Sequence, residues 1–382
     1  APETGVPDTL RSVYQGTKGI MTNSFILWGH LTKKADFLSK EWVPPQFTRM
    51  PRQFYYGGAE VQAEKTIEWL RRIGVEADYV EYSASRQKFD LFHFFGVCAF
   101  DLMTAASAQA PIVVSPIYYS LNPAEFIKVK ILRKIPFTVF RGHWKALSLA
   151  KCLLPNSNAE KLQLKGHWGV AENRIRVVPN GVDEDFVGNA PDSFRKRFLP
   201  GWALGERFVF SAHRIESRKN SLLLVQAALK VGIPLAIAGQ VNSSAEERKY
   251  VSRVLELVES SSGKVCYLGA LCRNDLRNGY AAAHVHALPS ALETPGLASL
   301  EAGLNGANLV VGDCSPVREY FDGMAEFSDG SLGSLCSALE RTINQPRDCM
   351  GQSRQIRARF TWRRVAEETR RCYEYVFSGA SA

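Results

Sequence analysis

Short apolar runs alternate with longer amphipathic segments along most of the chain, a pattern typical of βα units and a parallel sheet. Two sets of such runs can be counted. The first set predicts strands at residues 25–28, 77–81, 91–95, 111–115, 152–155 and 175–178, and the second at residues 208–211, 235–238, 265–268, 285–288 and 309–311. Amphipathic segments at residues 60–73, 220–231 and 362–377 predict helices. The predicted fold class is therefore α/β, with two doubly wound sheets.

A Pro-Asn-Gly turn at residues 179–181 and a polar stretch rich in Pro and Gly at residues 189–205 separate the two sets. We therefore expect three parts: an N-terminal Rossmann-like domain at residues 1–200, a C-terminal Rossmann-like domain at residues 201–360, and a closing helix at residues 361–382. Thr361 is the expected N-cap of this helix, which should pack back toward the first domain. Two doubly wound domains joined in this way face each other across a cleft, where the strand ends bind ligands.

The composition of the 382-residue chain excludes two large classes of protein. The chain is 46% hydrophobic and 22% charged, which argues against disorder. Its apolar runs, such as residues 91–97, are much shorter than a membrane span of about 20 residues.

The first residues lack the basic start and apolar segment of a secretory signal, so a cytoplasmic location is expected. The eight cysteines form no C-x-x-C pair, and we expect mostly buried thiols without a metal.

The net charge of +9 is unevenly distributed. No acid occurs between Glu125 and Glu160, whereas seven Lys and Arg residues alternate with Phe, Ile and Trp there. Residues 128–145 could form an ordinary solvated helix face. They could instead contact an anionic membrane or an acidic acceptor, and the protein would then be peripheral at the inner face of the cell membrane. No nucleic-acid partner is expected, because the chain lacks a strand platform that interleaves aromatic and basic residues.

Several common motifs are absent, and each absence removes a class of function. No G-x-G-x-x-G follows a predicted strand, and no G-x-x-x-x-G-K-[ST], H-E-x-x-H or G-x-S-x-G occurs. Dinucleotide-dependent oxidoreductases, P-loop kinases, zincins and α/β-hydrolases therefore lose support.

The segment that follows the predicted strand at residues 285–288 carries candidate chemistry. A loop containing Glu293 leads to a helix that should begin near Pro295-Gly296, with Pro in the first helical position. Three N–H groups at this helix start would then face an anion, those of Gly296, Leu297 and Ala298. Glu301 lies more than a turn into the helix, so the two carboxylates can accept hydrogen bonds from hydroxyls at opposite ends of one bound molecule. The alternative is an exposed loop followed by a helix with two solvated glutamates.

Two cations follow the first predicted strand of the second domain. Arg214 and Lys219 lie in a strand-to-helix loop, at the same sheet edge as the helix start described above. Together they would neutralise a diphosphate, and each charge-assisted contact would contribute about 1.5–3 kcal/mol. Arg218 is expected to be a solvated neighbour.

The ordered set of motifs resembles the retaining GT-B glycosyltransferases of family 4, the glycosyl transferases group 1. The second half matches that family's C-terminal domain in Arg214-x4-Lys219, Tyr267-Leu-Gly269, Leu288-Pro-Ser290, Glu293-x7-Glu301, Gly312-Asp and Glu319. The rest of the chain matches its glycine loop, its strand ending in His, its interdomain segment and the start of its closing helix, in Tyr56-Gly57-Gly58-Ala59-Glu60, Phe89-Asp-Leu-Phe-His93, Arg176-Val-Val-Pro-Asn-Gly-Val-Asp183 and Phe360-Thr-Trp362. The resemblance implies the GT-B arrangement of two Rossmann-like domains.

By this resemblance, Arg214 and Lys219 hold the donor pyrophosphate and form the catalytic set with Glu293, which contacts hydroxyls of the transferred sugar. Glu301 binds the ribose hydroxyls. Further donor contacts are implied for Gly296, Leu297, Ala298, Leu268 and Gly269. The acceptor side and glycine loop are assigned to Gly57, Gly58, His93 and Tyr118. The donor is a UDP- or GDP-linked sugar, and neither a metal nor another cofactor is required.

The chain departs from the family pattern at four places. His213 and Asn220 replace the glycines that usually flank the Arg-Lys pair, and the usual E-G-F-G-L loop reads Glu293-Thr-Pro-Gly-Leu297. A His often found after the strand at residues 111–115 is missing. Its hydrogen-bonding role would then pass to one of three side chains, those of Tyr118, Tyr119 and His93.

Three assignments keep a plainer alternative. His93 could equally be a core histidine, and the Gly57-Gly58 pair an ordinary tight turn. Asp183-Glu-Asp185 matches a D-x-D metal motif, but it lies in the interdomain segment, and we interpret it as an acidic turn.

The predicted function is that of a hexosyltransferase-type enzyme. It would move a sugar, with retention, from a nucleoside diphosphate to a hydroxyl of a glycan or lipid-linked acceptor in bacterial cell-surface polysaccharide synthesis. The alternative from another class is a catalytically degenerate GT-B protein that binds a nucleotide sugar or serves as a scaffold, which the four departures would explain. A nucleotide-sugar epimerase or a phosphorylase on the same fold is less favoured.

Overall fold

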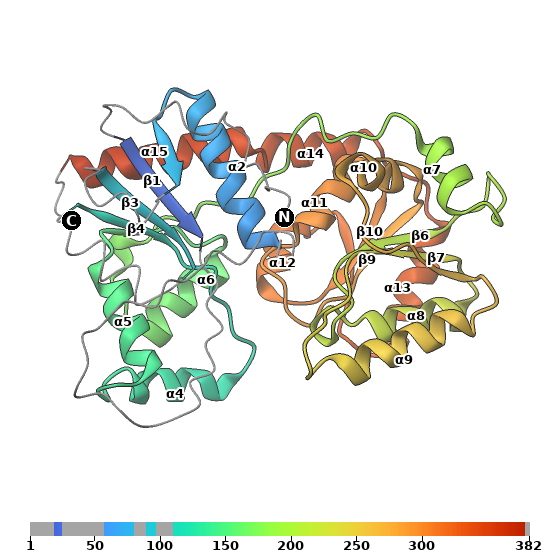
Figure 1. Ribbon diagram of the computed structural model, residues 1–382, viewed down its shortest axis with the longest axis horizontal. Helices are drawn as coiled ribbons and strands as arrows, with labels where there is room; N and C mark the ends of the chain where they lie inside the picture. Colours follow the sequence, from blue (N-terminus) through green and yellow to red (C-terminus); the bar gives the residue numbers. More distant parts are fainter. Residues whose placement is uncertain (1–18, 25–56, 80–88, 97–109, 379–382) are drawn as a thin grey trace, which may run out of the picture.

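The computed structural model of the chain describes residues 19–24, 57–79, 89–96 and 110–378. These residues form two lobes that lie side by side, each built around a parallel β-sheet (Figure 1). The first sheet has the strand order β2-β1-β3-β4-β5, and the second the order β11-β10-β9-β6-β7-β8. The α/β class with two doubly wound parallel sheets is therefore confirmed.

The first sheet consists of β1 (Gly19–Ser24), β2 (Ala77–Tyr79), β3 (Phe89–Phe95), β4 (Ile112–Ser115) and β5 (Cys152–Leu153). The strand predicted at residues 25–28 lies outside the described residues, and β1 precedes it. The strand predicted at residues 175–178 is wrong, because Ile175 forms only an isolated parallel bridge with Leu153. The segment still follows the edge of the sheet, since Val178 N donates to Pro155 O at 2.9 Å.

The second sheet consists of β6 (Val209–Ala212), β7 (Leu235–Ala238), β8 (Val265–Tyr267), β9 (Val285–Leu288), β10 (Asn308–Gly312) and β11 (Ala325–Ser328). The first five agree with the predicted strands to within one residue at every end. The sixth was not predicted, because its sequence Ala-Glu-Phe-Ser carries no continuous apolar run and its first three residues are only partly buried at the sheet edge. The chain passes from β6 outward to β7 and β8 and returns to β9 on the other side of β6. The order of this sheet therefore reverses between β6 and β9.

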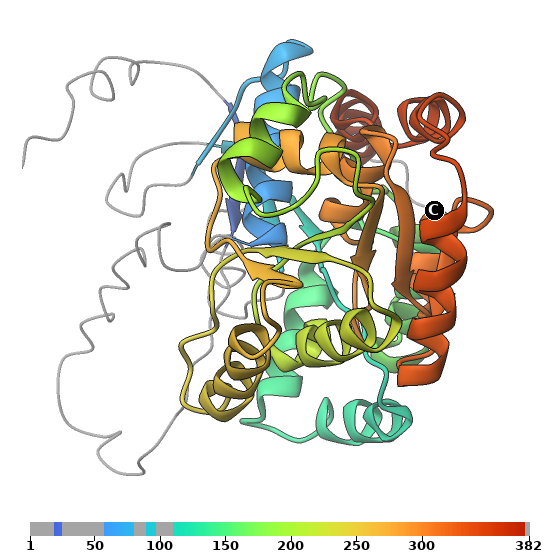
Figure 2. The same cartoon turned by 90° about the vertical axis from the view of Figure 1, so that its right-hand side faces the viewer.

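Helices flank both sheets. Their bounds are α2 (Gly58–Arg72), α4 (Pro123–Leu132), α5 (Val139–Leu149), α6 (Asn158–Gln163), α7 (Pro191–Phe198), α8 (Ser221–Val231), α9 (Arg248–Glu259), α10 (Arg273–Ala282), α11 (Leu297–Leu304), α12 (Ser315–Phe321), α13 (Leu332–Asn344), α14 (Gly351–Arg359) and α15 (Trp362–Phe377). Helix α8, together with α9 and α13, covers one face of the second sheet, and α10, α11, α12 and α14 cover the other (Figure 2).

Alternation along the strands divides the apolar side chains between two cores in each lobe. In β6, Phe210 packs in the core on one face of the second sheet and Val209 in the core on the other face. In β3, Phe92 and Phe94 pack on one face of the first sheet and Leu91 on the other. This is the period of two that a strand buried on both faces requires.

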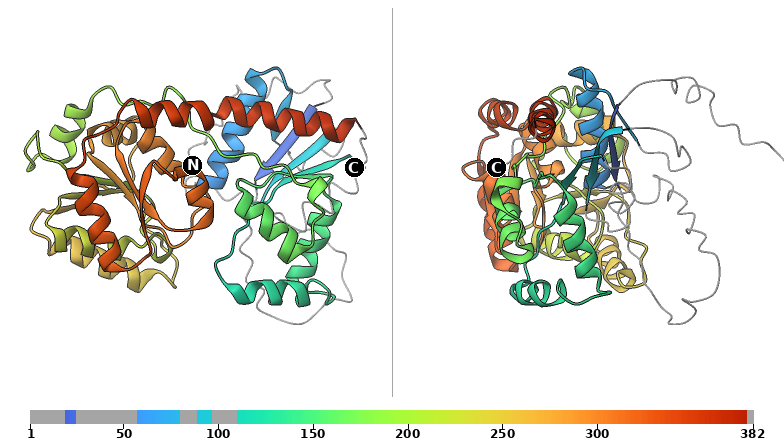
Figure 3. Two further views of the ribbon diagram at one scale, coloured as in Figure 1. Left: turned by 180° about the vertical axis from the view of Figure 1, so that it is seen from behind. Right: turned by 90° about the vertical axis from the view of Figure 1, so that its left-hand side faces the viewer.

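The last helix returns to the first lobe. Helices α14 and α15 run in succession from the second lobe to the first (Figures 1 and 3). Thr361 caps α15, because its Oγ1 accepts a hydrogen bond from Arg364 N at 3.3 Å. Trp362 and Tyr373 of α15 share one core with Ile67 of α2 in the first lobe. A side chain at Gly181 in the interdomain segment would meet the backbone of Thr361. The two segments that connect the lobes, the interdomain segment and the start of α15, therefore touch there.

Candidate active site

Two loops meet where the strand order of the second sheet reverses. One follows β6 and ends in a short 3-10 turn at Ser217–Lys219, and the other joins β9 to α11. Asn220 Nδ2 donates to Pro289 O at 2.8 Å, and Ala291 N donates to Arg218 O at 2.9 Å. These bonds hold the loops together at the carboxyl edge of the sheet, the edge at which such sheets bind ligands.

Lys219 and Glu293 form an ion pair between these loops. Their side chains are only 13% and 16% exposed. Burial alone would raise the pKa of Glu293, but the charge and hydrogen bond of Lys219 outweigh burial, so the pKa of this carboxyl lies below its usual value. Glu293 is therefore a carboxylate at neutral pH, and Lys219 is fixed at the edge of the sheet.

Arg214 reaches from the second lobe to the glycine loop of the first. Gly57 is the N-cap of α2, and a Cβ at this position would lie 3.7 Å from Arg214 Nη2. Gly57 N donates to Glu60 Oε2 at 3.0 Å, which fixes the start of α2. Arg214 also lies 3.5 Å from Glu216 Oε2. The structure thus brings Arg214, a residue predicted to bind the pyrophosphate, next to Gly57. A Cβ at Gly58 would meet open space.

Helix α11 begins later than predicted. Its first residue is Leu297, and its N-cap Gly296 has a φ of +99°, a conformation that glycine adopts without strain. Pro295 therefore precedes the helix instead of occupying its first position, and that detail of the prediction is wrong. A Cβ at Gly296 would lie 3.1 Å from Glu293 Cγ, so the missing side chain lets Glu293 pack against the helix start. The N–H groups of Leu297 and Ala298 lie in the first turn, which has no acceptors within the helix.

A chain of charges links Glu301 to the first lobe. Glu301 Oε1 lies 3.5 Å from Arg273 Nη1, and Arg273 Nη2 lies 3.0 Å from Asp183 Oδ2. Lys65 of α2 lies 2.8 Å from the same Asp183 oxygen. Asp183 is therefore a largely buried bridge between the lobes, and its interpretation as part of an acidic turn was incomplete. In the part of the chain that the structure describes, no group of three or more His, Cys, Asp and Glu side chains is placed to hold a metal.

Burial raises the pKa of Glu301 to about 7, with a further increase from Asp183, while Arg273 and Lys65 act in the opposite direction. The two candidate carboxylates therefore differ in charge near neutral pH. Glu293 is ionised beside Lys219, and Glu301 titrates in the physiological range.

Leu268 and Gly269 follow β8 at the same edge. Leu268 N donates to Ile237 O at 2.8 Å, and Gly239 N donates to Gly269 O at 2.7 Å. A side chain at Gly239 would overlap the carbonyl oxygen of His213, the residue before Arg214. The carboxyl ends of β6, β7 and β8 are thus packed closely. Leu268 and Gly269, which were predicted to contact the donor, therefore lie at the same edge of the sheet as Arg214.

The two residues predicted for the acceptor side bond with protein groups of the first lobe. His93 is buried, its Nδ1 lies 2.7 Å from Tyr373 Oη, and its Nε2 lies 2.9 Å from Ser115 Oγ. Burial lowers the pKa of His93 to about 3, so the ring is neutral. These contacts favour the alternative of a core histidine. Tyr118 is half-buried, its Oη lies 3.1 Å from His167 Nδ1, and burial raises its pKa to about 12.

Two of the four departures from the family pattern have local structural reasons. Asn220 has a φ of +54°, and Asn is among the few residues that tolerate this conformation in place of Gly. His213 is buried, with its ring nitrogens 2.8 Å from Ser211 Oγ and 2.9 Å from Ser221 Oγ, so it links β6 to α8. Both side chains therefore lie at the two ends of the loop that contains Lys219.

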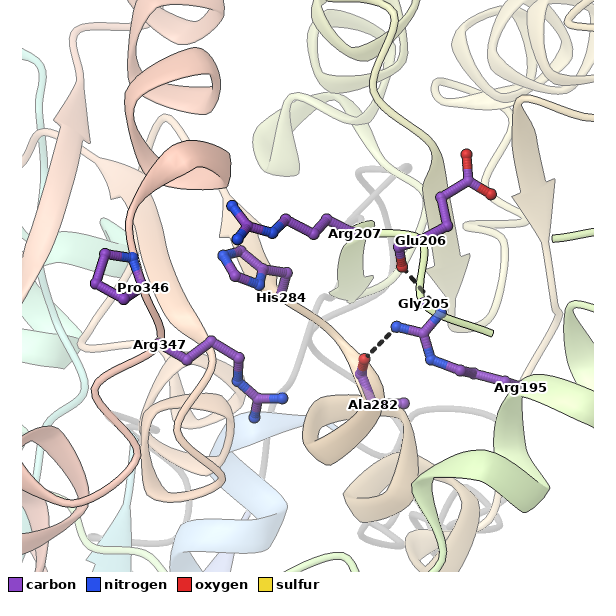
Figure 4. A pocket seen from close by; sticks show the side chains of 8 residues that line it. All are labelled: Arg195, Gly205, Glu206, Arg207, Ala282, His284, Pro346 and Arg347. Atoms are coloured by element: carbon purple, nitrogen blue, oxygen red, sulfur yellow. Dashed lines mark hydrogen bonds between the residues drawn. The ribbon is translucent and has the colours of Figure 1, made fainter. Parts of the chain in front are cut away.

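A cavity of about 420 Å³ lies elsewhere on the second lobe (Figure 4). Arg207 and His284, which stand just before β6 and β9, place it at the amino ends of those strands. Its other arginines, Arg195 and Arg347, donate to backbone oxygens near helix ends, including Ala282 O at 2.9 Å and Ala281 O at 2.8 Å. The cavity is therefore separate from the predicted site, and its arginines cap helix carbonyls.

Two family models match consecutive parts of the chain. The model described as Glycosyltransferase Family 4 matches residues 81–186, and the one described as Glycosyl transferases group 1 matches residues 192–332. Among curated proteins, D-inositol 3-phosphate glycosyltransferase of Mycolicibacterium smegmatis is 28% identical in an alignment of 245 residues that covers 62% of this chain. The match covers only 56% of that protein, so the chain spans little more than half of its length.

Solved structures with the GT-B fold resemble most of the molecule, including both lobes. Sucrose-phosphate synthase of Thermosynechococcus elongatus superposes with a TM-score of 0.70 at 16% identity, covering 85% of this chain and 94% of that one. HepE of Anabaena, solved with UDP and glucose, superposes with a TM-score of 0.65 at 16% identity, covering 83% and 96%. At such identities the likeness concerns the fold alone, which is the one predicted.

Proposed function

Since the chain belongs to the family 4 glycosyltransferases, the glycosyl transferases group 1, and has the GT-B fold, we propose that it transfers a sugar from a nucleoside diphosphate to an acceptor hydroxyl with retention. The observation that carries the proposal is the pair of loops where the second sheet reverses, which holds Arg214 and Lys219 at the edge from which α11 begins. We propose a UDP- or GDP-linked hexose as donor. HepE, which has this fold, was solved with UDP and glucose.

Stabilisation of the leaving group is the main catalytic task in this proposal. As the bond between the anomeric carbon and the phosphate oxygen breaks, its electron pair stays on the diphosphate. Arg214, Lys219 and the N–H groups of Leu297 and Ala298 oppose the negative charge that develops there. The Lys219 ammonium carries three donors, and its hydrogen bond to Glu293 uses one of them. Because these cations can take over the charge that a metal would neutralise, we propose that no divalent metal is needed.

The electrostatics at Glu293 support attack from the same face as the leaving group. Glu293 is held by Lys219, which lowers its basicity, so it is better suited to accepting hydrogen bonds from sugar hydroxyls than to attacking the anomeric carbon. We propose that the acceptor oxygen bonds to the anomeric carbon while its proton passes to the departing phosphate oxygen. Glu301 accepts hydrogen bonds from the ribose hydroxyls in this arrangement.

The acceptor is proposed to be a hydroxyl of a glycan or of a lipid-linked precursor in cell-surface polysaccharide synthesis, at the cytoplasmic side of the membrane. The curated relatives are named for another acceptor, D-inositol 3-phosphate. A phosphorylated cyclitol therefore belongs in any panel of acceptors.

Isothermal titration with UDP, GDP and their sugars, paired with an assay of slow donor hydrolysis, tests the proposal. We expect one diphosphate series to bind and its sugar to be hydrolysed slowly in the absence of acceptor. Binding without hydrolysis or transfer would instead support a degenerate protein that only binds the nucleotide sugar. If no nucleoside diphosphate binds, both the sugar transferase and the degenerate nucleotide-sugar-binding protein are contradicted.

A further inference from the structure

Exposed apolar side chains gather on one part of the first lobe. Of the fourteen large hydrophobic side chains that the structure describes as exposed, eight lie in residues 121–149, which comprise α4, α5 and the segments beside them. They are Leu121, Phe126, Ile127, Ile131, Ile135, Phe137, Val139 and Leu149. Such a concentration is unusual on a monomeric surface and marks a site of interaction. We call residues 121–149 the α4–α5 surface.

The fold does not need these side chains for its core. Each helix buries a separate inner side, with Val129 from α4 and Leu147 from α5. Ile127 and Ile131 lie one helical turn apart on the outer side of α4 and are 60% and 55% exposed. Phe137, in the connection between the helices, is fully exposed. Helix α4 lies at the outer end of the first lobe, away from α15 (Figures 1 and 3).

Unpaired cations surround the apolar side chains. Glu125 is the only acid between residues 121 and 159. In the described ranges, no carboxylate forms an ion pair with Lys128, Lys130, Lys134 or Lys145. The Lys130 ammonium lies 5.3 Å from the Phe126 ring centre, and that of Lys128 lies 5.2 Å from the Phe140 ring centre. The lysine stems therefore lie along the apolar surface while their charges stay near water.

We propose that the α4–α5 surface docks on the face of an anionic lipid bilayer. Such a bilayer attracts lysines through its phosphate groups and also accepts apolar side chains between its headgroups, so it satisfies both features at once. An acidic polymer in water would pair with the lysines but would leave Ile131 and Phe137 exposed. No helix within the described residues is long and apolar enough to span a membrane.

The docking surface adjoins the acceptor side of the first lobe. Strand β4 ends at Ser115, and the segment that contains Tyr118 leads directly from it to α4. Docking through α4 would therefore hold the carboxyl edge of the first sheet close to a lipid-linked acceptor. The docking itself does not depend on the proposed sugar transfer, but this consequence for the acceptor does.

Flotation of the full chain with vesicles tests the role of charge. Vesicles of equal parts phosphatidylcholine and phosphatidylglycerol should bind the protein at low salt, and vesicles of phosphatidylcholine alone should not. Lys130→Gln with Lys134→Gln should lower the partition coefficient roughly 10- to 30-fold. The matched control, Lys249→Gln with Lys264→Gln, removes the same charge from exposed positions of the second lobe and should bind as the wild type does.

A second pair of variants tests the apolar contact. Ile131→Ser with Phe137→Ser should lower the partition coefficient by about tenfold or more, because both side chains leave water on docking. Met350→Ser, at an exposed apolar position of the second lobe, should have no effect. Donor hydrolysis without vesicles should be unchanged in all these variants, which shows that they are folded and separates docking from sugar transfer.

Equal binding to neutral and anionic vesicles would overturn the proposal, as would wild-type binding by both α4–α5 double variants. Binding to soluble dextran sulfate without binding to vesicles would assign the surface to an acidic polymer instead.

Discussion

Lys219 and Glu293 form a largely buried ion pair between the loops that follow β6 and β9. The loops come from strands that are adjacent in the sheet but distant in the sequence. The pair thus joins the two halves of the second lobe at the point where a ligand is expected. In the proposed function, it places the cation assigned to the diphosphate beside the carboxylate assigned to the sugar.

The ion pair should stabilise the fold in a way that depends on both partners. Lys219→Met leaves a mostly buried carboxylate without its cation and should cost on the order of 2–4 kcal/mol in the free energy of unfolding at pH 7. Adding Glu293→Gln removes the unpaired charge and should recover part of this loss. Urea unfolding of both single variants and the double variant measures the coupling. Additive effects would show that the pair contributes no coupling energy.

Turnover should depend on Arg214 and Lys219, the two cations proposed to oppose the leaving-group charge. Arg214→Ala or Lys219→Ala should lower kcat/KM for transfer or for donor hydrolysis by more than about tenfold, because each charge-assisted contact is worth about 1.5–3 kcal/mol. Arg218→Ala is the matched control, since Arg218 lies in the same loop with its side chain 50% exposed and paired with Glu216. Near-normal rates for Arg214→Ala or Lys219→Ala would remove the diphosphate assignment.

The stability of the protein should fall as pH rises through the range in which Glu301 ionises. The pKa of Glu301 is raised to about 7 in the folded chain, from an unfolded value near 4.5, so the folded state binds the extra proton between these values. The free energy of unfolding therefore decreases from about pH 5 to pH 7. Glu301→Gln should remove the part of this decrease that comes from Glu301. Glu160, whose pKa is also raised to about 7 by burial, contributes a similar pH dependence. Its contribution is the same in the variant and the wild type, so the difference between their urea unfolding free energies at the two pH values reports Glu301 alone. A wild-type pH dependence in the variant would contradict the assignment.

Asn220 should be sensitive to substitution because of its backbone conformation. Asn220→Ala puts a residue that tolerates the left-handed conformation less well than Asn at this position and loses the bond to Pro289 O, so it should cost roughly 2 kcal/mol. Asn220→Gly loses the bond but relieves the conformation, and it should cost clearly less. Thermal unfolding of the two variants checks the order. Equal losses would show that the left-handed backbone is not what selects Asn here.

The α/β class and the central strands of the second lobe could be predicted from sequence, because a short apolar run such as Val285-His-Ala-Leu288, ended by Pro289, is typical of a strand buried on both faces. Two segments at the edges of the sheets could not be predicted. Strand β11 carries a glutamate at a partly buried edge, and the segment at residue 175 makes one bridge although its sequence resembles a strand. The start of α11 was misplaced because Gly296 adopts a positive φ that spacing alone does not reveal.

The candidate site was partly predictable for a related reason. Arg214, Lys219 and Glu293 could be placed because each follows a strand whose carboxyl end must lie at one edge. The bridge formed by Lys65, Asp183 and Arg273 could not be predicted, because it joins a helix of the first lobe to the interdomain segment and to a helix of the second. Nothing in the sequence around His93 separates a core histidine from a catalytic one. The two hydrogen bonds of its ring in the structure favour the core role.

The most direct test of the central claim is the affinity of the chain for a nucleoside diphosphate, measured by isothermal titration on the wild type, Lys219→Ala and Arg218→Ala. We predict that UDP or GDP binds the wild type, that Lys219→Ala binds it more than about tenfold more weakly, and that Arg218→Ala stays within about twofold of the wild type. Failure of both diphosphates to bind the wild type, or equal affinity in the two variants, would contradict the claim that Lys219 and its neighbours form a diphosphate site.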